Sequence, residues 1–175
     1  MRRLNFGQLL SRTLARLRRS PLRRSRKRTA TPESLEARVL LDANLVKDIN
    51  PVPSLDGSSP NFLVEINGTV FFTANDGSLG TELWKSDGTS SGTVLVRDIW
   101  YGSSSSTTRY LTNVNGTLYF TSNDGSTGYE LWKSDGTSSG TVRVLDIRSG
   151  TSGSSPFYLT NVNGTLYFQI GRAHF

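Results

Sequence analysis

One segment of this chain is repeated at a fixed spacing. ELWKSDGTSSGT occupies residues 82–93 and again residues 130–141, and NVNGTLYF occupies residues 113–120 and 161–168. Both repeats have a period of 48 residues, and residues 65–72 are a looser copy of the second one. Self-similarity at such a period is typical of stacked supersecondary units, none of which can bury its apolar face alone. The sequence therefore predicts tandem units that depend on their neighbours for stability.

Each unit contains four short runs suited to β-strands and separated by turn residues. In the second copy these runs are 110–114, 117–122, 129–133 and 141–147. Asn115-Gly116 joins the first two runs, and this dipeptide favours the two positive φ angles of a type I′ hairpin turn. We therefore predict an all-β fold of tandem four-stranded repeats that is β-propeller-like and is a fragment of a longer array. Residues 46–49 are predicted to be the last strand of a preceding unit.

Alternation along the strands predicts which side chains are buried. Leu118 and Phe120 point to one face of their strand, and Trp132 shares a face with Glu130. We expect each sheet to be half-buried, with the covered face against a neighbouring unit. Trp84 and Trp132 are the predicted core anchors, because burying an indole removes about 150 to 250 Å² from water, which stabilises the fold by at most about 4 to 6 kcal/mol.

Charge is distributed unevenly along the chain. Residues 1–28 hold eleven Arg and Lys and no acid, whereas nine basic and fourteen acidic side chains follow them. We interpret 1–28 as a basic targeting arm that is disordered or partly helical. Binding of nucleic acid or an anionic membrane through this arm is a weaker hypothesis, because no nucleic-acid-binding fold surrounds it. No specific nucleic acid is expected as a partner.

A short motif follows the arm, within residues 29–44. It resembles the LEPR-XLL motif of large, repetitive surface proteins from planctomycetes and other bacteria, and the matching residues are Leu35, Glu36, Arg38, Leu40 and Leu41. Ala37 stands where that family usually has proline. The resemblance implies sorting or export to an extracellular or cell-surface location. The alternative is one amphipathic helical turn that joins the arm to the repeats. No apolar run is long enough to predict a transmembrane segment.

Residues 45–168 resemble the ELW-x-x-DGT repeats of large bacterial surface proteins. The signature residues are Glu82, Leu83, Trp84, Asp87, Gly88 and Thr89, and in the next copy Glu130, Leu131, Trp132, Asp135, Gly136 and Thr137. The resemblance implies a β-propeller or a related array of stacked sheets, and no known catalytic activity. Residues 169–175 depart from the repeat and are predicted to be an artefactual or truncated tail, so His174 is not a candidate for a mechanism.

Catalytic and cofactor motifs are missing from the sequence. The chain has no Cys and a single His, and it contains neither a nucleophile elbow nor a phosphate-binding loop. Carboxylate pairs such as Asp76 with Glu82 recur in both copies, which indicates a role common to every unit. We therefore predict that the protein is not an enzyme and needs no cofactor.

Calcium is the one ion that the loops are suited to bind. Asp76, Asp124, Asp87 and Asp135 each precede a glycine in a turn, and such turns can supply oxygen ligands to hard cations. The interpretation we favour is that each Asp caps its own turn, because each loop offers only one carboxylate.

Three functional hypotheses follow from these observations. The leading one is a non-enzymatic cell-surface or secreted repeat protein that acts as a structural or adhesion scaffold. Its partners would be further repeats of the same chain, cell-envelope components or glycans. The alternative is a Ca²⁺-dependent carbohydrate- or ligand-binding β-propeller, and the third hypothesis assigns binding to the basic arm.

Overall fold

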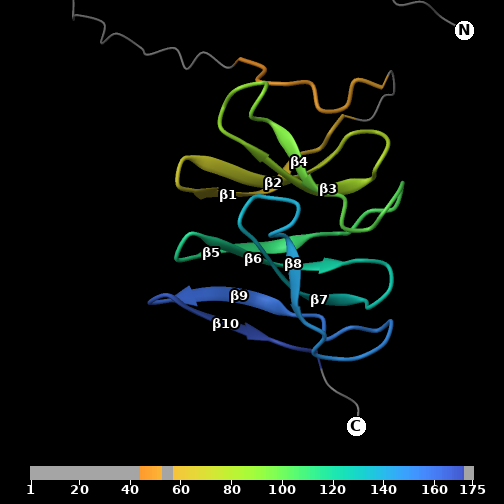
Figure 1. Cartoon of the computed structure of the whole chain (residues 1–175), viewed down its shortest axis with the longest axis vertical. Coiled ribbons are helices and arrows are strands. Elements are labelled where there is room, and N and C mark those ends of the chain that lie inside the picture. Colours follow the sequence, from red (N-terminus) through yellow and green to blue (C-terminus); the bar gives the residue numbers. More distant parts are fainter. Residues whose placement is uncertain (1–43, 53–56, 172–175) are drawn as a thin grey trace, which may run out of the picture. The chain divides into compact units, whose positions relative to one another are not determined.

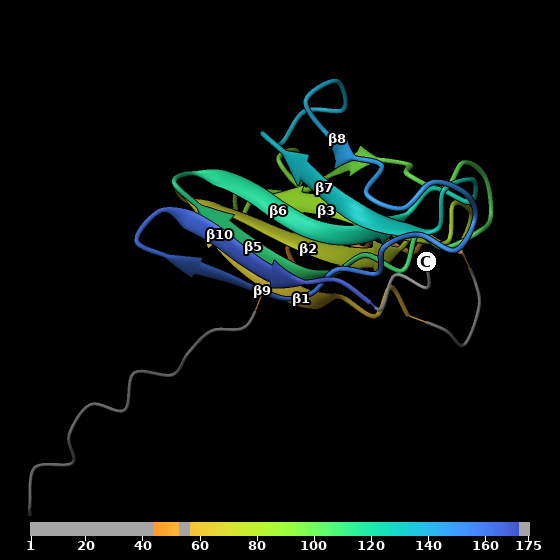
Figure 2. The same ribbon diagram turned by 90° about the horizontal axis from the view of Figure 1, so that it is seen from below.

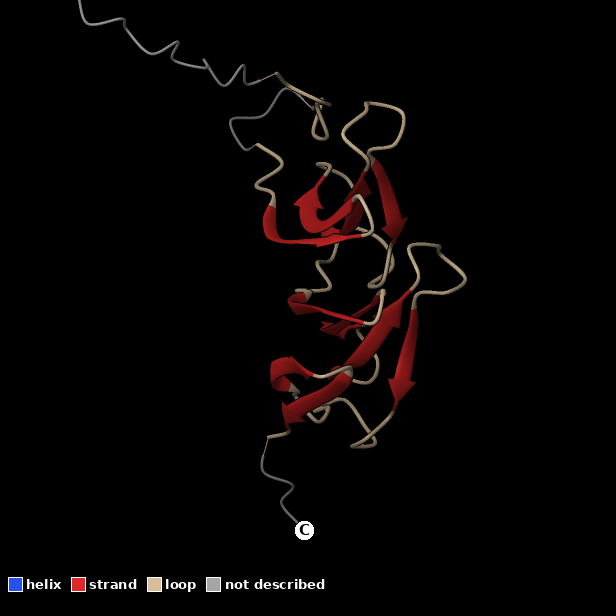
Figure 3. Cartoon of the chain, turned by 90° about the vertical axis from the view of Figure 1, so that its left-hand side faces the viewer, coloured by secondary structure: helices blue, strands red, loops and turns tan. Residues whose placement is uncertain are grey.

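A computed structural model describes residues 44–52 and 57–171. The basic arm and the LEPR-XLL-like motif lie outside these residues. The described residues form ten β-strands and no helix, arranged as antiparallel sheets of four, four and two strands (Figures 1 and 3). None of them forms a helix that could cross a membrane. The predicted all-β class and the repeat organisation are confirmed, and no closed barrel or propeller ring is found in this part of the chain.

The sheets follow the sequence period, and we call residues 57–104, 105–152 and 153–171 the first, second and third units. The first sheet is a meander of β1 (Asn61–Ile66), β2 (Thr69–Asn75), β3 (Thr81–Ser86) and β4 (Val94–Arg97). The second repeats it as β5 (Arg109–Val114), β6 (Thr117–Asn123), β7 (Tyr129–Ser134) and β8 (Val142–Leu145). The third sheet contains β9 (Phe157–Val162) and β10 (Thr165–Gln169). Strand order in each sheet equals chain order.

The Asn-Gly hairpins form as predicted. Asn115 and Gly116 have φ angles of 52° and 83°, the positive values that a type I′ turn requires. Asn67-Gly68 and Asn163-Gly164 repeat this conformation in the other two units. Local turn chemistry therefore sets the register of the first strand pair in every unit.

The hydrophobic core lies between the sheets. Its first-unit members are Ile66, Phe71, Leu83, Val96 and Ile99, and its second-unit members are Leu118, Phe120 and Trp132. Figure 1 shows the sheets stacked one on the next, and Figure 2 shows that corresponding strands run in similar directions. Each unit thus completes its neighbour's core.

The adjacent Leu and Trp of the signature face opposite sides of their strand. Leu83 belongs to the core shared with the second unit, whereas Trp84 packs with Phe72 on the other face. Trp84 is 7% exposed and Trp132 is 5% exposed, so both predicted anchors are confirmed as buried. The Leu-Trp pair therefore supplies one apolar side chain for each neighbouring layer.

Three expectations about the sheets were wrong. Central strand β6 is buried on both faces, since Phe120 and Thr121 point to opposite sides and are 0% and 2% exposed. The interior of the middle sheet therefore has no solvent face, and exposure is confined to edge positions such as Val144 and Leu145 of β8. The fourth strand ends at Leu145 instead of residue 147, because the N–H of Ile147 donates to the carboxylate of Glu130. Residues 46–49 form no strand, since the described residues include no strand that pairs with them.

Candidate functional site

The signature glutamates are buried anchors for the connection to the next unit. The Oε2 atom of Glu82 accepts the N–H of Ile99 at 3.0 Å, and its Oε1 accepts the N–H of Ser106 at 2.8 Å. In the second copy, Glu130 accepts the N–H of Ser154 at 2.7 Å. Burial raises the pKa of Glu82 to about 7, and the backbone N–H groups oppose this shift. Both glutamates are fully enclosed, so they hold a linker in place and contact no solvent.

The Asp-Gly-Thr segment of the signature forms a closed hydrogen-bonded turn. Asp135 Oδ1 accepts the hydroxyl of Thr137 at 2.7 Å and its N–H at 2.8 Å, and these bonds lower the pKa of Asp135. The Thr137 hydroxyl in turn accepts the N–H of Gly140 at 2.9 Å. A Cβ atom at Gly140 would overlap the Asp135 carboxylate. The first unit contains the same turn around Asp87.

The other two aspartates named from the sequence cap turns as well. Asp76 Oδ1 accepts the N–H groups of Ser78 and Leu79, both at 2.8 Å. Asp124 Oδ1 accepts the N–H of Thr127 at 2.8 Å, and its Oδ2 lies 3.6 Å from the guanidinium of Arg143. The four candidate aspartates thus occupy four separate turns. Among the described residues, no group of three or more acidic or histidine side chains is placed to hold a metal ion.

Cationic side chains connect successive layers through these turns. Lys85 Nζ donates to the carbonyl of Gly136 at 2.8 Å, and Arg97 donates to the carbonyl of Thr141 at 2.6 Å. One layer earlier, Lys47 donates to the carbonyl of Thr93 at 2.8 Å. The turn that begins at the signature Asp therefore accepts hydrogen bonds from the preceding layer.

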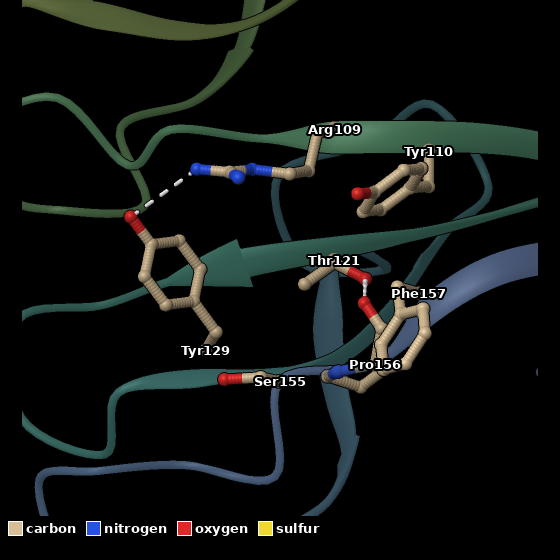
Figure 4. A pocket seen from close by; sticks show the side chains of 7 residues that line it. All are labelled: Arg109, Tyr110, Thr121, Tyr129, Ser155, Pro156 and Phe157. Atoms are coloured by element: carbon tan, nitrogen blue, oxygen red, sulfur yellow. Dashed lines mark hydrogen bonds between the residues drawn. The ribbon is translucent and has the colours of Figure 1, made fainter. Parts of the chain in front are cut away.

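A cleft between the second and third units is the candidate binding site. It has a volume of about 270 Å³, and it is lined by Arg109 and Tyr110 of β5, Thr121 of β6, Tyr129 of β7, and Ser155, Pro156 and Phe157 of the third unit (Figure 4). The hydroxyl of Thr121 donates to the carbonyl of Pro156 at 2.7 Å, which ties the two walls together. The cleft therefore exists only where two units meet.

A β-bulge positions the aromatic wall of this cleft. Arg109 pairs with Thr121 and Thr112 with Tyr119, so β5 carries one residue more than β6 across this interval. Tyr110 lies within the bulge and has a φ of 58°, a left-handed conformation that is strained for a bulky side chain. Bulges commonly redirect a side chain toward a site. Here the redirected side chain is an aromatic ring that is 38% exposed.

The guanidinium of Arg109 is held in a defined plane. It lies 4.9 Å from the centre of the Tyr129 ring, within the range of a cation–π interaction. Its Nε donates to the carbonyl of Thr107 at 3.3 Å, and one terminal nitrogen donates to the Tyr129 hydroxyl at 3.4 Å (Figure 4). No acidic side chain lines the cleft. Arg109 therefore gives the cleft a positive charge.

An equivalent cleft lies 48 residues earlier, between the first and second units. Its volume is about 280 Å³, and Phe62 and Thr73 occupy the positions of Tyr110 and Thr121. Asn61 replaces Arg109, and Thr81 replaces Tyr129. The repeat thus builds the same cleft twice, and only the later copy is cationic.

Sequence reasoning missed this site. Arg109 and Tyr129 are 20 residues apart in the chain, and Phe157 comes from another unit, so no short motif contains them. One signal was present, because Phe62, Tyr110 and Tyr158 place an aromatic residue at the same position of every unit. Comparing the copies position by position would have found it.

Comparison of the chain with protein-family models, with curated proteins and with solved structures finds no match. The resemblances to ELW-x-x-DGT repeats and to the LEPR-XLL motif therefore stay predictions from the motifs themselves.

Proposed function

We propose that this protein is a non-enzymatic repeat scaffold whose units stack to form an extended surface. The observation that carries this proposal is the use of the signature residues at the contacts between layers. Leu83 and Trp84 pack against opposite layers, and Lys85 donates to a turn of the next unit. A segment devoted to these contacts is suited to a stacked array.

The acidic residues of the repeat support a non-enzymatic role. Glu82 and Glu130 are enclosed and bonded to linker N–H groups, and Asp87 and Asp135 are bonded within their own turns. Because the same engagement recurs in both copies, it is a property of the repeat and not of a single reactive centre. These carboxylates therefore serve the architecture.

The proposal requires that the stability of each unit depends on its packing against the next unit. Leu83→Ala removes a buried side chain of β3 that packs toward the second unit. Native-state hydrogen exchange should then lose protection in β6 of the second unit as well as in β3. If only the first unit loses protection, the units are independent domains and the stacked-scaffold proposal fails.

We further propose a cell-surface or secreted location, with adhesion as the use of the scaffold. The basic arm and the motif at Leu35 to Leu41 support this proposal through their resemblance to a sorting signal. A peptide tag inserted after Gly150, where the structure leaves open space, allows fractionation of cells that express the chain. A tag confined to the cytosol would rule out this location.

A β-propeller-like array is the finer structural proposal. Each four-stranded meander has the topology of a propeller blade, and the next unit would pack against the same type of face. Small-angle scattering of a chain with additional units distinguishes a compact ring from an open stack.

The alternative function is ligand binding, and the repeated cleft favours it. Calcium dependence, the other part of that alternative, has less support, because the candidate aspartates are each engaged in their own turns. Calorimetric titration with Ca²⁺ tests calcium binding directly, and heat of binding that corresponds to one site per turn would support the calcium hypothesis.

A further inference from the structure

We propose that the cleft around Arg109 binds an acidic saccharide, with a carboxylate on the guanidinium and the sugar ring against the aromatic wall. This inference rests on the stacking part of the proposed function, because the cleft is built from two adjacent units. It adds the chemical class of ligand that the surface would recognise.

The charge of the cleft selects an anion. Among the described residues, the ion pair is formed by Arg143 and Asp124 and does not involve Arg109. No carboxylate lines the cleft that contains Arg109. Tyr129 and the Thr107 carbonyl hold the guanidinium by one face and one edge, which fixes its plane. A fixed guanidinium suits the planar, two-oxygen geometry of a carboxylate.

The remaining walls select a sugar ring. Tyr110 and Phe157 offer apolar ring surfaces, and the hydroxyls of Tyr129 and Ser155 offer hydrogen bonds beside them (Figure 4). Aromatic rings with polar groups at their edges suit a ligand that has apolar C–H faces and peripheral hydroxyls. The volume of about 270 Å³ equals that of roughly nine water molecules at about 30 Å³ each, which is enough for one pyranose ring. A bare inorganic anion would leave the aromatic wall unused.

The conformation of Tyr110 supports a binding role for the wall. A left-handed φ at a bulky residue is unfavourable and persists only where the surrounding fold imposes it. All three units impose it at this position, with φ angles of 54° at Phe62, 58° at Tyr110 and 55° at Tyr158. The repeat thus keeps an aromatic residue in a strained conformation, where its ring borders the cleft in both described copies.

The earlier cleft is an internal control. It keeps the aromatic residue as Phe62 but has Asn61 and Thr81 in place of the cation and its supporting ring. We therefore expect one acidic-saccharide site in the wild-type chain, at Arg109. The change Asn61→Arg together with Thr81→Tyr should create a second.

The experiment is calorimetric titration of the full chain with trigalacturonic acid, and with maltotriose as a neutral probe of the same length. We expect one site for the acidic probe and little or no binding of the neutral one. Arg109→Asn, which copies the earlier cleft, should weaken binding at least tenfold. The Asn61→Arg, Thr81→Tyr variant should raise the stoichiometry from one to two.

Several outcomes would overturn the inference. These are equal binding of both probes, retention of affinity in Arg109→Asn, or no binding of the acidic probe to the wild type. A peptide with a free C-terminal carboxylate that binds in place of the saccharide would assign the cleft to another ligand class. The hydrogen-exchange test on Leu83→Ala is independent, so stacking without binding refutes only this inference. Failure of stacking removes both.

Discussion

Arg97 of the first unit donates a 2.6 Å hydrogen bond to the backbone carbonyl of Thr141 in the second unit. The same guanidinium lies 6.0 Å from the ring centre of Trp132, which belongs to the core shared by the two units. One side chain therefore joins a polar contact and an aromatic contact across the same interface. Lys47 makes the corresponding bond to Thr93 one layer earlier, whereas Leu145 stands at the equivalent position of the second unit.

Replacing this cation should weaken the interface. Arg97→Ala removes a charge-assisted hydrogen bond and a cation–π contact, and we expect a loss of about 1 to 2 kcal/mol in the free energy of unfolding. Urea denaturation of the variant and the wild type measures this difference in the free energy of unfolding. Arg148→Ala removes an exposed arginine and serves as the control, with an expected change within about 0.5 kcal/mol. Equal effects of the two changes would contradict a specific role for Arg97.

The signature tryptophan should be among the most sensitive positions. Trp132→Ala leaves a cavity between two units next to Phe120, whose ring centre lies 6.5 Å from that of Trp132. We expect a loss of about 3 to 5 kcal/mol. Tyr101 is 92% exposed, so Tyr101→Ala should have almost no effect in the same denaturation experiment. A loss below about 1 kcal/mol for Trp132→Ala would show that the core does not depend on it.

Gly140 should tolerate no side chain while Asp135 keeps its place. Because a Cβ atom there would overlap the Asp135 carboxylate, Gly140→Ala forces the turn apart, at an expected cost of about 1 to 3 kcal/mol. Gly57 has open space around it, and Gly57→Ala should be neutral. The double variant Asp135→Ala, Gly140→Ala should be less impaired than the two single changes added together. Strict additivity in thermal unfolding would disprove the overlap.

Stability should depend on pH through Glu82. Its pKa is raised to about 7 in the folded protein from a usual value of 4.5, so folding favours the protonated form. The contribution of this group is complete below pH 4.5 and is lost as pH rises to about 7; it amounts to about 3 kcal/mol from the shift in pKa. Denaturation midpoints measured across this window should fall with rising pH. Glu82→Gln should flatten the slope, and an unchanged slope would assign it to another group.

The turn aspartates Asp87 and Asp135 should make the fold less stable as the pH falls, which is the opposite of the effect expected for Glu82. Hydrogen bonds from Thr89 and Thr137 lower the pKa values of Asp87 and Asp135 below the usual 3.8. The stability they supply is present above pH 3.8 and is lost as pH falls through their folded pKa values. Asp87→Asn combined with Asp135→Asn should reduce this acid sensitivity, as followed by circular dichroism between pH 4 and pH 2.

Much of the local structure could be predicted because it depends on neighbouring residues. The Asn115-Gly116 turn forms from the φ preferences of two residues, and its strands follow from alternation over six or seven residues. Because these segments recur in the sequence, the corresponding strands of the next unit are expected 48 residues later. The burial of Trp84 and Trp132 could also be predicted from the sequence, because large apolar side chains on short strands are stabilised by packing in a hydrophobic core.

The sequence by itself therefore determined the all-β class, the period, the hairpins and the anchors. Tertiary structure alone decided that both faces of the central strand β6 are buried, that Glu82 binds the N–H of Ser106, and that Arg109 and Phe157 line one cleft. Turn and strand preferences act over a few residues. Contacts between layers instead depend on how two complete surfaces fit together, which no local pattern specifies.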